Sequence, residues 1–239
     1  MAEHLQESHA IFRYGGFAFQ IAKAASVFRS RAARYIRWVI NAREMSQIVA
    51  DLAERHKNLG RIIATAPLCD LGATPKSRSN FESLVLSVIS QQLATAAANT
   101  ISKRFIDQVG KITPKRILSS DIEEIRNVGL SAAKTKTILG LAEAAKNLDL
   151  ENIDSKPDSQ IYEQLTKLWG IGPWTVDMFM MFQLGKLNIW PVGDLGVRRG
   201  WEKINRLKEE IAPEQLFKKG EKFQPYRSVV AWYCWRAVD

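Results

Sequence analysis

Apolar residues recur at intervals of three and four along most of the chain, and almost no segment alternates with a period of two. Intervals of three and four place side chains on one face of an α-helix, whereas strands need alternation. We therefore predict an all-α fold. The predicted helices cover 45–63, 80–90, 95–108, 158–168, 173–184, 195–204 and 227–235, with further helices beginning at Pro114, Asp121, Ser131 and Pro213.

The most informative stretch is the junction between the predicted helices 158–168 and 173–184. Gly170 and Gly172 break the first helix, because glycine adopts backbone angles that are closed to other residues. Pro173 suits the first turn of the second helix, where its missing N–H is no loss. The pattern predicts a tight helical hairpin whose second helix starts with free backbone N–H groups, a site suited to a phosphate oxygen.

One carboxylate follows this hairpin closely in the sequence. Asp194 comes twenty residues after Trp174, just before the predicted helix 195–204. Each feature has a purely structural alternative: Gly-x-Gly at a helix junction is often only a turn, and an aspartate at a helix start is most often an N-cap. A second glycine turn, at 127–131, leads into a helix with Lys134 and is either a further phosphate contact or a plain turn.

The composition is that of a globular protein with one or two domains. The chain has 239 residues, of which 46% are hydrophobic, and it contains no run of eighteen apolar residues that would predict a membrane-spanning helix. Its two cysteines, Cys69 and Cys234, cannot form a disulfide framework or a four-thiolate metal site, which suits a reducing compartment. The formal net charge of +9 favours a polyanionic partner, but +5 of it belongs to residues 1–43, so charge alone does not establish nucleic-acid binding.

Residues 1–44 differ from the rest of the chain. No acidic residue occurs from Ser8 to Arg43, while arginines recur among alanine, phenylalanine and isoleucine. Three interpretations are open: a transit peptide, a basic helix at a membrane surface, or an upstream extension of a functional protein that starts at Met45. We favour the extension and assign no chemistry to it.

Two motifs combine into a more specific pattern: Leu-x-x-Leu-Trp-Gly-Ile-Gly-Pro-Trp-Thr at 165–175 and Trp-Pro-Val-Gly-Asp-Leu-Gly-Val-Arg-Arg at 190–199. Together they resemble the helix–hairpin–helix superfamily of DNA glycosylases, most of all its 3-methyladenine DNA glycosylase II branch. The resemblance runs from about Phe81 to the C-terminus. It implies two helical subdomains with the active-site cleft between them, in a domain at 45–239 with the hairpin motif at about 158–184 and a catalytic loop at 185–196. The endonuclease III branch usually carries a four-cysteine iron–sulfur cluster, which two cysteines exclude.

The resemblance implies that Asp194 is the catalytic carboxylate and that Trp174, Met178 and Trp235 form the base pocket. An N-alkylated purine is already cationic, so it leaves without a strong general acid, and one carboxylate can stabilise the developing sugar cation. Bifunctional members have a lysine at the position of Trp174; an indole cannot form a Schiff base, so we expect base release without strand cleavage. No cofactor is needed. In related proteins a monovalent cation sits at the hairpin backbone, and we assign no other metal.

The turn Gln91-Gln92-Leu93 after the predicted helix 80–90 resembles the turn that supplies the family's intercalating residue. A polar interhelical turn without function is the alternative. We expect Leu93 to be the wedge that fills the gap left by a flipped base, with Gln92 as its hydrogen-bonding neighbour. The other expected DNA contacts are Gly170, Gly172, Thr175 and Arg198, with Arg199 as a further candidate.

We thus expect a monomeric, monofunctional DNA glycosylase of base excision repair that removes 3-methyladenine and 7-methylguanine from double-stranded DNA. No membrane association is expected. Its location would be the cytoplasm with the nucleoid in a bacterium and the nucleus in a eukaryote. Two alternatives stay open: a non-catalytic helix–hairpin–helix DNA-binding module, and a glycosylase that has lyase activity or acts on a different damaged base, such as an oxidised purine.

Overall fold

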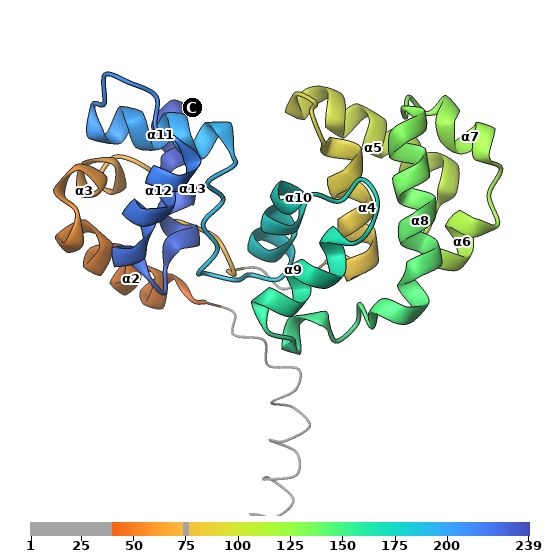
Figure 1. Ribbon diagram of the computed structural model, residues 1–239, viewed down its shortest axis with the longest axis horizontal. Helices are drawn as coiled ribbons and strands as arrows, with labels where there is room; N and C mark the ends of the chain where they lie inside the picture. Colours follow the sequence, from red (N-terminus) through yellow and green to blue (C-terminus); the bar gives the residue numbers. More distant parts are fainter. Residues whose placement is uncertain (1–39, 74–76) are drawn as a thin grey trace, which may run out of the picture. The chain divides into compact units, whose positions relative to one another are not determined.

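The structure, a computed structural model, describes residues 40–73 and 77–239, and every regular element in those ranges is helical (Figure 1). This confirms the predicted all-α fold. None of the described helices is long and apolar enough to cross a membrane. The elements are α2 Ala42–Arg55, α3 Lys57–Ile63, α4 Asn80–Ser90, α5 Thr95–Val109, α6 Pro114–Leu118, α7 Ile122–Asn127, α8 Ala132–Leu148, η1 Ile153–Ser155, α9 Asp158–Thr166, α10 Pro173–Met178, η2 Phe179–Gln183, α11 Leu195–Asn205, α12 Pro213–Gly220, η3 Glu221–Phe223 and α13 Arg227–Val238.

The segment from α4 to η2 forms one group of helices, with α4 at its centre. Ser79 begins α4, because its side chain accepts a hydrogen bond from the Glu82 N–H. α4 is apolar on most of its circumference, as expected of a helix enclosed by others. α5, α8, α10 and η2 all pack against it. Its buried residues are Asn80, Phe81, Leu84, Val85, Val88 and Ile89.

A second group of helices draws on both ends of the described chain: α2 and α3 pack with α11, η3 and α13 (Figure 1). Residues 228–234 of α13 are all buried. α11 and α13 approach each other closely at Gly200, where an added Cβ would overlap the carbonyl group of Cys234. Since only glycine permits this approach, Gly200 sets the separation of the helices that carry Asp194 and Trp235.

The first helix among the described residues, α2, begins ahead of Met45, the residue at which the sequence places the start of the domain. Asn41 caps α2 in a capping box: its Oδ1 accepts from the Glu44 N–H at 2.9 Å, and its own N–H donates to the Glu44 carboxylate at 3.0 Å. The Ile40 N–H also donates to the Gly72 carbonyl. Residues 40–44 thus belong to the helical domain, and the rest of the predicted extension, 1–39, lies outside the described residues.

Two predicted helices are interrupted. The predicted helix 45–63 is divided at His56, whose extended backbone ends α2 and whose ring accepts the Leu59 N–H at 3.1 Å to start α3. The predicted helix 173–184 passes from α10 into a π-helical turn, η2, in which the Leu184 N–H donates to the Phe179 carbonyl. A π-turn adds one residue to a helical turn and is frequent at functional sites.

Candidate active site

The predicted hairpin is present between α9 and α10. Its two glycines are required for different reasons. Gly170 has φ +80°, and an added Cβ would overlap the Thr137 hydroxyl, so the fold itself requires glycine there. Gly172 precedes α10 with φ −93°, and an added Cβ would have nothing within 4 Å. Glycine at this open position suits the close approach of an external group, such as a phosphate, to the N-terminus of α10.

Asp194 lies at the start of α11, and its carboxylate accepts three hydrogen bonds. Oδ1 accepts from the Val197 N–H at 2.8 Å and from the Trp235 indole at 2.9 Å, and Oδ2 accepts from the Trp174 indole at 2.7 Å. Asp194 is therefore an N-cap, which is the purely structural role considered for it from the sequence. Two indoles, from α10 and α13, also donate to its carboxylate. Donors from three helices fix the orientation of this carboxylate.

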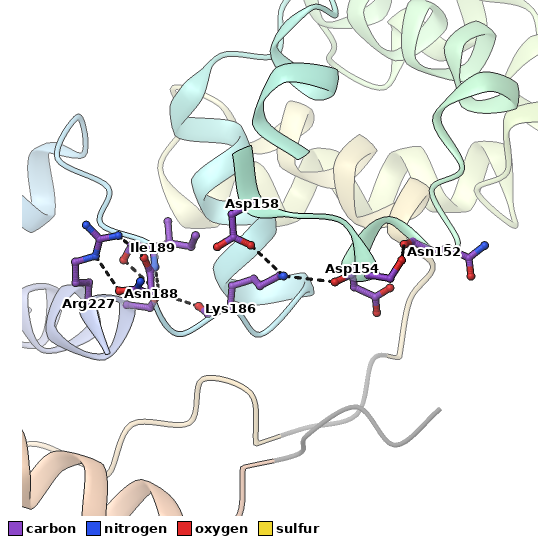
Figure 2. Close-up of polar contacts among 9 residues, drawn as sticks. Asn152, Asp154, Asp158, Lys186, Asn188, Ile189 and Arg227 are labelled. Atoms are coloured by element: carbon purple, nitrogen blue, oxygen red, sulfur yellow. Dashed lines mark hydrogen bonds and ion pairs between the residues drawn. The ribbon is translucent and has the colours of Figure 1, made fainter. Parts of the chain in front are cut away.

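The loop between η2 and α11, which delivers Asp194, is attached at several points (Figure 2). Lys186 forms an ion pair of 3.0 Å with Asp158 at the start of α9. Arg227, at the start of α13, donates to the side chain and to the carbonyl of Asn188, both at 2.9 Å. These contacts connect the loop to both groups of helices, so the position of the carboxylate does not depend on a free loop.

A cavity of about 280 Å³ adjoins the Trp174 ring, between α4 and the helix formed by α10 and η2. Trp174, Met178 and Phe182 line one side of it at intervals of four residues. Trp235 stacks on Phe182, with ring centroids 5.7 Å apart and planes 28° apart. The structure thus brings the three predicted base-pocket residues together and adds Phe182. A larger cavity of about 590 Å³, between α7, α8 and the end of α9, includes none of these aromatic side chains.

A second carboxylate, that of Asp177, is buried one helical turn after Trp174, and no sequence motif pointed to it. The Tyr162 hydroxyl donates a hydrogen bond to it. Burial raises the pKa of Asp177 to about 7, and the negative charge of Asp194 acts in the same direction. Asp177 is therefore largely protonated below neutral pH.

The predicted wedge residues lie on the turn between α4 and α5. Gln92 and Leu93 are both exposed, and Gln92 has a left-handed backbone with φ +54°. Their neighbour Gln91 points inward: its Nε2 donates to the Gly170 carbonyl at 3.0 Å and to the Thr175 hydroxyl at 2.8 Å. Thr175 is buried and its hydroxyl serves this internal link, and the predicted contact of Thr175 with DNA stays a prediction.

The basic residues proposed from the sequence as phosphate contacts differ in availability. Arg198, on α11, has a buried Nε without a hydrogen-bond partner in the described part of the chain. Arg199 pairs with Glu202 at 3.1 Å and also with Glu210. Lys134 donates to two backbone carbonyls at the end of α4. We therefore retain Arg198, alone of these three, as a predicted DNA contact.

Among residues 40–73 and 77–239, no cluster of three or more His, Cys, Asp or Glu side chains could hold a metal ion. A cation at the hairpin would be bound by backbone oxygens instead. The carbonyls of Leu168 and Gly170 each accept one hydrogen bond, from the Ile171 N–H and the Gln91 side chain, and each keeps a second lone pair. The cation at the hairpin backbone stays a prediction.

Comparison with known proteins connects this geometry with DNA repair. Residues 85–225 match the HhH-GPD superfamily of base excision DNA repair proteins. The chain is 31% identical over 210 residues to DNA-3-methyladenine glycosylase 1 of Schizosaccharomyces pombe. The aligned region covers 82% of this chain and 92% of that protein. It is 30% identical over 175 residues to the alkylbase DNA glycosidase-like protein mag2 of the same yeast, with 70% and 82% covered. The structure is similar to the S. pombe 3-methyladenine DNA glycosylase in complex with abasic DNA, with a TM-score of 0.69 and 30% identity over 80% of this chain and 95% of that one.

Proposed function

Since the chain belongs to the HhH-GPD superfamily of base excision DNA repair proteins and is a DNA glycosylase, we propose that it removes alkylated purines, including 3-methyladenine and 7-methylguanine, from double-stranded DNA. Both S. pombe relatives are named for alkylated bases, which supports this substrate class. The observation that carries the proposal is the position of Asp194 between the indoles of Trp174 and Trp235, beside an aromatic-lined cavity.

The side chains around the cavity favour a cationic base. N-alkylation gives a purine a positive charge, and the negative face of an aromatic ring attracts a cation. Trp174 and Phe182 line the cavity, and Trp235 stacks on Phe182. One cationic side chain, Arg78, also lines the cavity, but it is exposed and paired with Glu82 at 3.6 Å. The aromatic surface is therefore the main recognition element for the base.

The proposed reaction needs one carboxylate. The bond between C1′ and the base nitrogen breaks, and its electrons leave with the base and neutralise the positive charge there. The sugar is left with oxocarbenium character, which the negative charge of Asp194 stabilises. Water then adds to C1′ and loses a proton, so the products are the free base and an abasic site. Because the base is cationic before the bond breaks, a second carboxyl group is not required as a general acid.

We also propose that the protein leaves the DNA strand intact. A bifunctional glycosylase starts strand cleavage by attack of a lysine amine on C1′. Trp174 stands at the hairpin position of that lysine, and none of the described residues that line the cavity is a lysine. Without an amine at C1′, no Schiff base forms and the reaction stops at the abasic site.

Every group of the proposed site comes from one chain, so we propose that the protein acts as a monomer. Duplex DNA is its partner, in keeping with the similar structure that was solved with abasic DNA. Its location follows that of the genome: the nucleoid in the cytoplasm of a bacterium, or the nucleus of a eukaryote.

The test is the release of methylated bases from duplex DNA by the wild type and by Asp194→Asn. Asparagine keeps the size and one capping oxygen but removes the charge, so we expect release to fall by about 100-fold or more. The matched control is Asp121→Asn. Asp121 also begins a helix, with Oδ1 accepting from the Glu123 N–H at 2.7 Å, and it does not line the cavity. This control should release bases at the wild-type rate.

The same samples test the claims separately. Half of each sample is heated in alkali, which cuts abasic sites, and we expect cuts in that half only. Cuts without alkali, with an adduct trapped by borohydride, would overturn the absence of lyase activity. If the wild type bound DNA without releasing a base, the protein would be a non-catalytic binding module or a glycosylase for a different lesion. Equal release by wild type and Asp194→Asn would remove Asp194 from the chemistry.

A further inference from the structure

The turn that carries Gln92 and Leu93 has little support of its own. The Gln91 N–H donates to the Val88 carbonyl and the Leu93 N–H to the Ser90 carbonyl, both at 3.3 Å. Gln92 has φ +54°, a left-handed conformation that is unfavourable for residues other than glycine. Such a turn persists only when surrounding structure holds it.

Lys134 supplies part of this support from α8. Its ammonium group donates to the Ile89 carbonyl at 2.7 Å and to the Gln91 carbonyl at 2.8 Å. Both carbonyls lie at the C-terminal end of α4, where the helix offers no further N–H donors and its dipole favours a cation. The side chain is partly buried, and burial lowers the pKa of its amine. The Lys134 ammonium group is therefore held by one backbone segment and is not a free surface charge.

The same turn is also attached to the hairpin. The Gln91 side chain donates to the Gly170 carbonyl at 3.0 Å and to the Thr175 hydroxyl at 2.8 Å. α8 reaches the hairpin as well, because Thr137, one turn after Lys134, lies against Gly170 without room for a Cβ. The turn, the hairpin and α8 thus contact one another in all three pairs.

We propose that Lys134 is a positioning residue for base flipping: it holds the turn with Gln92 and Leu93 at a fixed spacing from the hairpin, which is predicted to bind a DNA phosphate. This inference rests on the proposed function. A protein that binds a DNA phosphate and inserts a turn into the same duplex must keep both surfaces at one spacing, because the duplex fixes the distance between its backbone and its base stack. Loss of the ammonium leaves two carbonyls without their donor and frees the turn, while Asp194 keeps all three of its donors.

The effect of Lys134 should then depend on how firmly the lesion is held in the duplex. Extruding a base from the duplex costs the free energy of its pairing and stacking, so the cost is lower for a base without a pairing partner. A displaced turn therefore slows release from a paired site more than from an unpaired one. General damage to the fold, or to the chemistry at Asp194, slows both alike.

The test compares Lys134→Met with the wild type in single-turnover release of 7-methylguanine from two duplexes. One duplex has cytosine opposite the lesion, and the other has an abasic residue there. We expect release to fall by about tenfold or more from the paired duplex and by less than about threefold from the unpaired one. The matched control is Lys136→Met, on the same helix, where the amine is exposed and lies 4.5 Å from the centre of the Trp169 ring. This control should match the wild type on both duplexes.

A second readout follows extrusion without chemistry. In the Asp194→Asn background, 2-aminopurine beside the lesion reports unstacking by its fluorescence, and the rise on binding should be smaller with Lys134→Met. Should circular dichroism show that Lys134→Met does not fold, Gln91→Met, which removes the bonds to the hairpin, must reproduce the loss confined to the paired duplex.

Two results overturn the inference: equal slowing on both duplexes in a folded variant, or no slowing on either. Failure of the wild type to release the base from either duplex is a different result, which overturns the proposed function and not the role of Lys134 alone.

Discussion

Asp177 and Asp194 are close enough for the charge of one to affect the other, yet the protein holds them in different ways. Asp194 accepts hydrogen bonds from two indoles and a backbone N–H. Asp177 is only 8% exposed, and the Tyr162 hydroxyl donates to it. With a pKa of about 7, Asp177 is largely neutral in mildly acidic solution, and above that pH two like charges share one region.

Asp177→Asn should therefore make the stability of the protein less sensitive to pH. The pKa of about 7 in the folded protein lies above the ordinary value of 3.8, so between these values the folded protein holds a proton that the unfolded chain has lost. The stabilisation from this proton is complete below the ordinary pKa and is lost as the pH rises through the folded one, by up to about 4 kcal/mol.

Urea unfolding of both proteins at about pH 5 and about pH 8 measures this difference. We expect the wild type to lose free energy of unfolding relative to Asp177→Asn as the pH rises. The control is Asp121→Asn, which removes an exposed carboxylate at the N-cap of α7 and should follow the wild type. Equal pH dependence of wild type and Asp177→Asn would show that the Asp177 carboxyl group is not held neutral by burial.

Asp194, Trp174 and Trp235 could be grouped from the sequence, because the short motifs around them resemble those of a known family, and the structure brings the three side chains together. Phe182 had a weaker signal, its spacing from Met178, but a helix rich in Met and Phe is usually core. Asp177 had none, and the glycine turn before Lys134 indicated a different role for that residue, a phosphate contact. Their roles depend on partners in other helices, the carbonyls at the end of α4 and the hydroxyl of Tyr162, which no local pattern encodes.

At the scale of elements, apolar spacing located almost every helix, because one buried face is enough to define it. It did not locate the two interruptions. Leu52 and Leu59 are both buried on either side of His56, so the apolar pattern continues where the helix does not. In η2 the extra residue lies within an apolar run that contains no Gly or Pro, and a single π-turn leaves the spacing nearly unchanged.

The hairpin glycines should separate stability from DNA binding. Gly170→Ala places a Cβ at positive φ and against Thr137, so we expect a loss of about 2 kcal/mol or more in the free energy of unfolding. Gly172→Ala meets open space at φ −93°, so stability should stay within about 0.5 kcal/mol of wild type while affinity for an abasic duplex falls.

Urea unfolding and fluorescence anisotropy with the abasic duplex measure the two effects on the hairpin. Wild-type affinity for Gly172→Ala would mean that no DNA group approaches this position closely. Wild-type stability for Gly170→Ala would mean that α8 shifts away from the hairpin at little cost.

At the scale of the whole molecule, the two thiols lie where distant segments meet. Cys69 is 3% exposed in the connection between α3 and α4, and Cys234 is fully buried in α13. The Trp232 indole donates to Asp70 at 3.1 Å and so attaches that connection to α13. Exposure of Cys69 therefore requires part of α13 to be released.

We expect both thiols to resist an aromatic disulfide reagent in the folded protein and to react together when it unfolds. Burial raises the pKa of Cys69 to about 12 and also raises the pKa of Cys234, so neither thiol is a ready nucleophile. The measurement is the labelling rate at about pH 8 of Cys69→Ser and Cys234→Ser, which should be equal and match the rate of global unfolding. Faster labelling of Cys69 would show that the connection between α3 and α4 opens by itself.

The close approach of α11 and α13 at Gly200 has a consequence for reading genetic data. Any larger side chain there separates the two helices and so moves the carboxylate away from the Trp235 indole. In a mutagenesis screen scored by survival of alkylation, position 200 would rank with position 194, although it takes no part in the chemistry. Such a screen would not distinguish substitutions that displace helices from substitutions that remove a catalytic group. Measuring the abundance of each folded variant as well would separate the two.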